Sequence, residues 1–285
     1  MRWSAGTEAP RTRAPANATD CHFHIYDPSF PAASYAKLLP PPASVSDYMA
    51  LKRRLGITRS VLIQPSTYGT NNKAYLGLLP ELGRDRTRMV AVVNTSVTDQ
   101  ELRGMHAAGV RGIRFNLAQA GATTLDMVEP LSARVDSMGW HCQINMPGED
   151  IVAAKDVFLR VPGKLVFDHL AHVPEPAGVN SPTFALIRRL LDKGNTWVKL
   201  SGAYADTKVG PPTYADSSAV AKAYVQAAPQ RLVWGSDWPH PTEAVTKKPD
   251  DALLFDLFAS WMPDEATRHR ILVENPAELY GFPAG

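Results

Sequence analysis

Residues 20–28 read Asp-Cys-His-Phe-His-Ile-Tyr-Asp-Pro, and the interpretation of the fold starts from this stretch. Its apolar run, Cys21–Tyr26, has the length of a buried strand. Side chains two positions apart lie on the same face of a strand, so we expect His22 and His24 to point the same way. Two imidazoles that converge at a strand end can bind a metal ion or polarise a carbonyl oxygen.

Seven more apolar runs of similar length follow, and longer amphipathic segments separate them. The runs are Ser60–Gln64, Met89–Asn94, Gly112–Asn116, His141–Asn145, Leu165–His169, Trp197–Ser201 and Leu232–Ser236. Short continuous apolar runs are typical of parallel strands that are covered by helices. Eight such strands favour one α/β domain over residues 19–285, a closed (β/α)₈ TIM barrel. A doubly wound open sheet is the alternative, but no Gly-x-Gly-x-x-Gly follows the first strand.

The segments between the runs have helix signals. They are Ser46–Leu55, Asn72–Leu82, Thr98–Ala108, Leu125–Met138, Asp150–Phe158, Pro182–Asp192, Ser217–Ala227 and Asp250–Trp261. Thr98 and Glu101 have the spacing of a capping box. The last segment, Asp264–Leu279, contains Asn275-Pro276, where we expect the helix to break. Residues 1–18, rich in Ala, Pro, Thr and Arg, predict a flexible N-terminal arm.

The bulk composition argues against several classes of protein. In 285 residues, 30 Lys+Arg and 28 Asp+Glu leave a net charge of +2, whereas nucleic-acid binding needs a clustered basic excess. No apolar run approaches the roughly 18 residues of a membrane span, and the N-terminus lacks the run of about 7–15 apolar residues of a signal peptide. With only Cys21 and Cys142, we expect no disulfide framework and a cytoplasmic location. Both a monomer and a homo-oligomer stay open.

In TIM barrels the chemistry lies at the C-terminal ends of the strands. The sixth run ends at Asp168-His169, with His172 three residues later, and the eighth leads into Asp237-Trp-Pro-His240. An aspartate that faces histidines in a cleft can act as a general base on water. The predicted catalytic residues are His22, His24, His169 and Asp237.

These windows resemble the amidohydrolase superfamily, and more narrowly its branch containing 2-pyrone-4,6-dicarboxylate lactonase, L-fuconolactonase and D-galactarolactone isomerase. The resemblance extends from about Thr19 to Tyr280. Its most specific segments are Asp20–Pro28, Arg111–Asn116, Phe167–His169, Trp234–His240 and Val273–Pro276. It implies a TIM barrel of the amidohydrolase type and an enzyme that opens lactones, and its site residues match the four predicted catalytic ones.

Two departures from the wider superfamily bear on the cofactor. Metal-dependent members add a Lys or Glu on strand 4 or a His on strand 5 as ligands. Here strand 4 offers Arg114 and Asn116, and strand 5 ends Gln143-Ile-Asn145. A guanidinium cannot ligate a cation and amides are weak ligands, so we expect no required cofactor. The alternative is a single divalent metal such as Zn²⁺, whose ligands would be His22, His24 and Asp237.

Arg114 bears on the substrate, because one guanidinium suits one carboxylate or lactone oxygen. The pyrone lactonase of the branch clamps two carboxylates with several arginines. The stretches after Arg114 and after strand 7 contain none, which favours a hydroxylated sugar lactone. The other candidates for substrate binding are polar or aromatic side chains near strand ends. They are Gln64, Ser66, Tyr68, Asn116, Asn145, His172, Tyr204, Trp238 and His240.

The prediction is a lactone hydrolase in which Asp237 activates water and His22, His24 and His169 donate hydrogen bonds to the oxyanion. Its partner is a small-molecule lactone or sugar acid. Three alternatives stay open: a sugar lactone isomerase, a metal-dependent hydrolase or decarboxylase, and a non-catalytic barrel that binds a sugar acid. A binding protein has little need for a carboxylate beside the histidines, which favours an enzyme.

Overall fold

The computed structural model describes residues 2–119 and 121–283, and its strands form one parallel sheet in the order β1 to β8. Residue 1 of the expected arm and residues 120 and 284–285 of the expected barrel domain lie outside the described part. The strands are β1 (Thr19–Phe23), β2 (Arg59–Ile63), β3 (Thr87–Ala91), β4 (Val110–Asn116), β5 (His141–Asn145), β6 (Lys164–Phe167), β7 (Thr196–Leu200) and β8 (Leu232–Trp234). Each pairs in parallel with the next.

The sheet curves into a nearly closed barrel, which confirms the predicted fold. Just beyond β8, Trp238 forms a parallel bridge with Phe23 of β1. The His24 N–H donates to the Trp238 carbonyl at 2.8 Å, and the Asp237 N–H donates to the His22 carbonyl at 2.8 Å. The seam between the first and last strands is therefore built from the segments that carry three of the four predicted catalytic residues, His22, His24 and Asp237.

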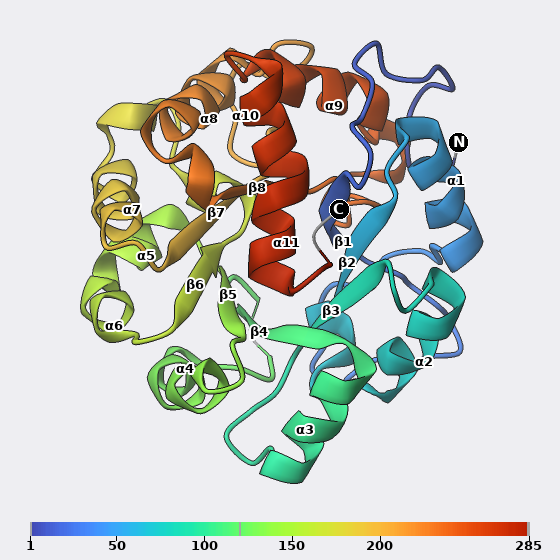
Figure 1. Ribbon diagram of the computed structural model, residues 1–285, viewed down its shortest axis with the longest axis vertical. Coiled ribbons are helices and arrows are strands. Elements are labelled where there is room, and N and C mark those ends of the chain that lie inside the picture. Colours follow the sequence, from blue (N-terminus) through green and yellow to red (C-terminus); the bar gives the residue numbers. More distant parts are fainter. Residues whose placement is uncertain (1, 120, 284–285) are drawn as a thin grey trace.

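Helices surround the ring of strands (Figure 1). They are α1 (Val45–Leu55), α2 (Lys73–Leu82), α3 (Asp99–Ala108), α4 (Val128–Asp136), α5 (Gly148–Ala153), α6 (Lys155–Arg160), α7 (Pro182–Asp192), α8 (Ala215–Ala227), α9 (Asp251–Ser260), α10 (Glu265–His269) and α11 (Asn275–Tyr280). The capping box of Thr98 and Glu101 is present at α3. The single helix predicted over Asp150–Phe158 was wrong: Ala154 leaves the helical conformation and separates α5 from α6.

The predicted break at Asn275-Pro276 was also wrong. Residues Arg270–Glu274 form a π-helical turn, and the chain continues directly into α11. Pro276 lies directly after this turn, as the second residue of α11, and has no N–H to give to the helical ladder. The wider turn before it lets the helix pass the proline.

The barrel interior is filled by a compact apolar cluster. Its members are Cys21, Val61, Ile63, Val90, Val166, Trp197, Val233, Leu279, Tyr280 and Phe282. The last three come from α11 and the residue after its cap, so the C-terminal segment closes the barrel; α11 crosses the ring of strands in Figure 1. The register of β1 against β2 shifts between Asp20 and Phe23. Such an irregularity re-aims side chains, and here Cys21 joins the interior cluster while His22 turns toward the site.

The N-terminal arm is hydrogen-bonded to the barrel's helices. The backbone N–H groups of Arg11 and Thr12 donate to Asp256 of α9 at 2.9 and 2.7 Å. Arg54 of α1 donates to the Glu8 carbonyl at 2.7 Å. The mobility of this arm stays a prediction. Within the described ranges, every helix is too short or too polar to cross a bilayer.

Candidate active site

A cavity of about 290 Å³ opens at the carboxyl ends of the strands. Nine of the predicted site residues line it: His24, Ser66, Arg114, Asn116, Asn145, His169, His172, Tyr204 and Asp237. They come from β4, β5 and the segments that follow β1, β2, β6, β7 and β8. The topology therefore brings together residues that are far apart in the sequence, as expected for this end of a TIM barrel.

Four polar atoms converge at the base of this cavity, where the fully buried His22 does not line the cavity itself but contacts the lining residues His24 and Asp237. The Nε2 atoms of His22 and His24 are 3.2 Å apart. Asp237 Oδ1 lies 3.5 Å from His22 Nε2, 3.7 Å from His24 Nε2 and 3.8 Å from His169 Nε2. All four side chains are buried. One carboxylate oxygen thus faces three imidazole nitrogens, with little water to screen their interactions.

Contacts behind the rings constrain their tautomers. His24 Nδ1 is 2.7 Å from the Ile63 carbonyl, which can only accept, so Nδ1 carries the proton. Neutral His24 therefore presents a lone pair at Nε2, an acceptor rather than the donor expected from the sequence. His169 Nδ1 is 2.9 Å from the Ser201 hydroxyl, which can donate or accept. His169 can therefore present an N–H to the cavity.

The protonation states follow from burial and from mutual contact. Burial lowers the pKa of His24 to about 4, and it also lowers the pKa values of His22 and His169. Burial alone would raise the pKa of Asp237, but its contacts with His169, His22 and His24 outweigh this and hold that pKa well below its usual range. At pH 7 the cluster therefore contains a carboxylate and neutral imidazoles.

The segment from His169 to His172 has an unusual backbone. All four of its residues have positive φ angles, between 46° and 58°. Non-glycine residues pay about 1–2 kcal/mol each for this conformation, so the surroundings must hold it. Gly202 (φ 62°) approaches so closely that a Cβ there would lie 2.9 Å from His169 Nδ1. Strain of this kind concentrates at functional sites.

Tyr204 connects Asp237 to a buried pair behind it. The Tyr204 hydroxyl donates to Asp237 Oδ2 at 2.6 Å and lies 2.8 Å from His240 Nδ1. His240 Nε2 is 3.2 Å from Asp251 Oδ2, and both of these side chains are buried. Among the predicted substrate-binding residues, His240 therefore lies behind the cavity wall and supports Tyr204.

The opposite wall carries a chain of hydrogen bonds. Asn116 Nδ2 donates to Ser66 Oγ at 3.3 Å, and Asn145 Nδ2 donates to Asn116 Oδ1 at 2.9 Å. The two ring nitrogens of His172 continue the chain: Nε2 lies 2.9 Å from Asn145 Oδ1, and Nδ1 lies 2.9 Å from Asp206 Oδ2. This wall offers amide, hydroxyl and imidazole groups to a substrate, and the Asp206 carboxylate lies at its rim.

Three predicted substrate-binding residues are used elsewhere. The Gln64 amide donates to the carbonyls of Gly69 and Asn71 and holds the loop after β2. Tyr68 accepts from the backbone N–H of Asp27. Trp238 is fully buried against Tyr48, with ring centroids 5.6 Å apart. The structure does not bring these side chains to the cavity.

Several residues of the site were missed from the sequence. Lys199 and Gln143 are fully buried beside His22, and Asp168, which was not among the predicted site residues, accepts from Arg114 Nε at 3.1 Å. A lysine inside an apolar run, Thr-Trp-Val-Lys-Leu, was the available signal. Tyr26 also lines the cavity, and its buried hydroxyl has no hydrogen-bond partner among the described residues.

The donor set fits a single divalent ion. His22, His24 and Asp237 each offer an atom within 4.8 Å of the others. Imidazole nitrogen and carboxylate oxygen are ligands that Zn²⁺ takes, and three protein ligands are usual in catalytic zinc sites. The contact of His24 with the Ile63 carbonyl is the kind of support that ligating histidines have.

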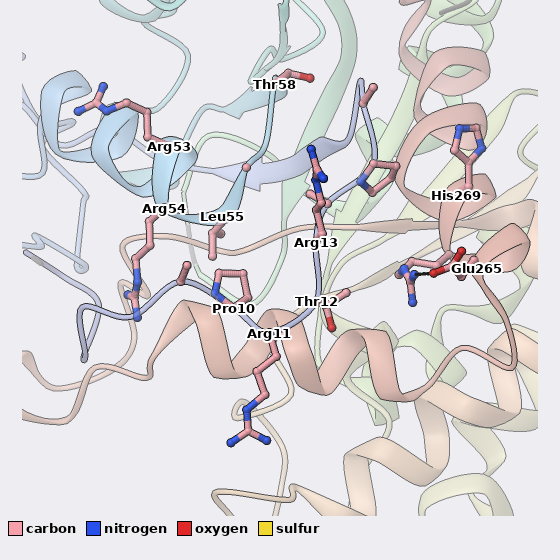
Figure 2. Close-up of a pocket in the computed structure, with 16 residues that line it drawn as sticks. Pro10, Arg11, Thr12, Arg13, Arg53, Arg54, Leu55, Thr58, Glu265 and His269 are labelled. Carbon is pink, nitrogen blue, oxygen red and sulfur yellow. Dashed lines mark hydrogen bonds and ion pairs between the residues drawn. The ribbon is translucent and has the colours of Figure 1, made fainter.

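A larger cavity, about 780 Å³, lies at the amino ends of β1 and β2, between the N-terminal arm, the end of α1 and α10 (Figure 2). Arginines and one histidine dominate its walls. Arg54 is paired with Asp250 at 2.6 Å, and Arg268 with Glu265 at 3.1 Å. Two arginines of this cavity are therefore held in ion pairs, and its charged side chains do not face one common point, unlike the groups at the carboxyl end.

A TIM barrel with His-x-His at the first strand and an aspartate after the last defines an enzyme of the amidohydrolase type. The chain belongs to the amidohydrolase family, whose model matches residues 19–282.

Its relatives include proteins named for lactone chemistry. The chain is 33% identical to a 2-pyrone-4,6-dicarboxylate hydrolase of Comamonas testosteroni, over 98% of this chain and 95% of the relative. It is 32% identical to a D-galactarolactone isomerase of Agrobacterium fabrum (98% and 96% covered) and 33% identical to a 4-sulfomuconolactone hydrolase of Rhizobium radiobacter (96% and 95%). A crystal structure of an Agrobacterium tumefaciens protein without ligand superimposes with a TM-score of 0.92 at 30% identity, with both chains fully covered.

Proposed function

We propose that this protein is a hydrolase that opens a small sugar-acid lactone, using water activated by Asp237 and no required metal ion. The observation that carries the proposal is the meeting of the Asp237 carboxylate with three imidazoles inside a small cavity. Such a group can take a proton from water while its neighbours stabilise the charge that develops on the carbonyl oxygen. The lactone-acting relatives support the same class of reaction.

The proposed reaction has two steps. Asp237 takes a proton from water as the water oxygen bonds to the lactone carbonyl carbon, and His24 Nε2 accepts the other water hydrogen. The oxyanion that forms accepts hydrogen bonds from His22 and His169, a contribution of about 2.7–4 kcal/mol per donor in comparable enzymes. The bond between the carbonyl carbon and the ring oxygen then breaks, and Asp237 returns its proton to that oxygen. The product is an open hydroxy acid.

The walls of the cavity favour a substrate with few charges. The cavity of about 290 Å³ lies at the lower end of the usual range for ligand sites, about 300–1,000 Å³. Arg114 is the guanidinium in its lining, whereas Asp206 and Glu243 place carboxylates at the rim. One carboxylate or lactone oxygen can pair with Arg114, and a second anionic group would meet the rim carboxylates. Hydroxyl groups suit the amides on the opposite wall.

A divalent ion, where bound, would be held by His22, His24 and Asp237 and would polarise the carbonyl as a Lewis acid. In our proposal the residues of the chain perform the proton transfers without it.

The test is a panel of 1,4- and 1,5-sugar lactones with a pH indicator, because hydrolysis releases an acid. We expect acid release from at least one lactone, by protein stripped of metal with a chelator. Product NMR distinguishes an open acid from a ring-shifted lactone, which would identify an isomerase in which a substrate hydroxyl replaces water. Tight binding of a lactone without formation of any product would contradict the proposal that the protein is an enzyme. Activity lost on chelation and restored by Zn²⁺ would contradict metal independence.

A further inference from the structure

The wall behind His22 contains a buried lysine that the proposed mechanism does not use. Lys199 lies in β7 with its side chain fully buried. Its Nζ donates to the Cys21 carbonyl at 2.9 Å and to Gln143 Oε1 at 2.8 Å. An ammonium has three hydrogens, so one remains. His22 Nδ1 is the next nearest hydrogen-bonding atom, at 3.3 Å.

Two groups compete for His22 Nδ1. Lys199 approaches it from one side, and Asp168 Oδ1 lies at the same distance, 3.3 Å. If Lys199 donates, Nδ1 is a lone pair and the ring proton sits on Nε2. If Nδ1 carries the proton, it points to Asp168 and Nε2 becomes a lone pair. The choice decides whether His22 offers the cavity a donor or an acceptor.

The contacts of His22 Nε2 favour the tautomer in which this atom carries the proton and acts as a donor. His24 presents a lone pair at Nε2, because its Nδ1 proton is used on the Ile63 carbonyl. A lone pair on His22 Nε2 would then face another at 3.2 Å and the Asp237 carboxylate at 3.5 Å. Such a group of acceptors needs a cation or another hydrogen-bond donor between its members. A proton on His22 Nε2 turns the same contacts into hydrogen bonds.

Asp168 does not depend on His22 for its stabilisation. Its Oδ2 accepts from Arg114 Nε and from Gln143 Nε2, each at 3.1 Å. Lys199 Nζ lies 3.5 Å from its Oδ1. Two cations therefore balance this buried carboxylate whichever tautomer His22 adopts.

We propose that Lys199 is a positioning residue that holds His22 as the Nε2–H tautomer, so that His22 donates into the cavity and the cluster binds metal weakly. The assignment deepens the proposed function, since it gives His22 its role as an oxyanion donor without a metal ion. A ligating histidine needs the opposite tautomer, with its back nitrogen protonated by contact with an acceptor. Removing the ammonium would leave Asp168 as the only competitor and favour that form.

The experiment measures the tautomer directly. Protein labelled with ¹⁵N-histidine is examined by NMR without metal and without substrate, and His22 is assigned by its loss in His22→Gln. In the wild type we expect a protonated Nε2 and an unprotonated Nδ1 for His22. In Lys199→Met the pattern should reverse, and Zn²⁺ affinity by calorimetry should rise about 10–100-fold, the usual size of such supporting contacts.

Lys52→Met is the matched control. Lys52 is also buried, with its Nζ donating to the Thr58 carbonyl at 3.2 Å and to Ser60 Oγ at 3.3 Å. Its loss should leave the His22 tautomer and Zn²⁺ affinity unchanged. A proton on Nδ1 of His22 in the wild type overturns the assignment, even if Lys199→Met fails to fold. An unchanged tautomer in folded Lys199→Met does so as well. The tautomer and the Zn²⁺ affinity are measured without turnover, so failure of the lactone assay and failure of this assignment can be told apart.

Discussion

The two ends of the barrel hold cavities that differ in size and in chemistry. The amino-end cavity is the larger, about 780 Å³ against 290 Å³. Its arginines Arg54 and Arg268 are paired with carboxylates at its edge, whereas at the carboxyl end four buried groups face one point. Convergence of titratable groups, rather than volume, identifies the candidate site.

The backbone shows the same contrast. Near the amino end, the left-handed positions before β1 and after α1 are taken by Asn17 (φ 63°) and Gly56 (φ 72°), two residue types that adopt this conformation readily. At the carboxyl end, Asp237 (φ 59°) and the residues from His169 to His172 adopt similar angles with full side chains. The barrel therefore accepts strain where side chains must be aimed. The variants below test this contrast.

The largest effect is expected for Asp237→Asn. The amide cannot accept the proton from water, so kcat should fall by roughly 10³-fold or more, within the range seen when a proton-transfer group is removed. The measurement is steady-state turnover on the lactone found in the panel. Glu265→Gln, which removes a carboxylate paired with Arg268 in the amino-end cavity, should leave kcat unchanged. Near wild-type turnover in Asp237→Asn would reject the assignment of the base.

Gly202→Ala should be the next most damaging. Its new Cβ would lie 2.9 Å from His169 Nδ1 and displace that ring, and a misplacement of about 1 Å can cost about 100-fold in rate. Gly210 also has a positive φ, 76°, but no atom lies within 4 Å of the Cβ position. Gly210→Ala therefore controls for backbone strain alone. Equal losses of kcat in the two variants would show that crowding of His169 is not the cause.

The pH dependence should follow His24. Its pKa is about 4 in the folded protein and 6.5 when unperturbed, so the unfolded chain binds the extra proton between these values. The free energy of unfolding should therefore fall as pH drops from 6.5 to 4, by about 3 kcal/mol for this group. Urea unfolding of wild type and His24→Asn at pH 7 and pH 4.5 measures it. The same acid sensitivity in both proteins would contradict this origin.

The smallest effect is expected for Tyr26→Phe. Tyr26 lines the cavity, and its buried hydroxyl has no hydrogen-bond partner among the described residues. If a substrate group reaches that hydroxyl, loss of the hydrogen bond should raise KM by about 2–10-fold, with kcat nearly constant. Tyr68→Phe removes a hydroxyl that serves Asp27 outside this cavity and should leave KM unchanged. If KM rose only in Tyr68→Phe, the substrate would have to bind beside Tyr68 instead of in this cavity.

The sequence was sufficient for the eight strands and for the convergence of His22, His24, His169 and Asp237. Strand periodicity and the shared rim of a parallel barrel determine both, and each is local or topological. Partners across the barrel were not predictable. Lys199 is stabilised by the Cys21 carbonyl and Gln143, which approach it only once the strands close.

The same limit explains why some residues predicted to line the cavity lie elsewhere in the structure. Trp238 was expected at the mouth, but its backbone pairs with β1 and directs its ring into the core. His240 follows on the same segment and turns toward Asp251. The direction of a side chain after a strand depends on the loop's own hydrogen bonds, which the apolar pattern does not encode.

The closure of the barrel by α11 has a consequence for biosynthesis. The interior cluster contains Cys21 from β1 together with Tyr280 and Phe282 from the opposite end of the sequence. A ribosome adds about 5–20 residues per second, so β1 leaves the ribosome tens of seconds before the residues that cover it. During that interval the apolar strands are exposed to other nascent chains, and we expect chaperone binding to end only when α11 emerges.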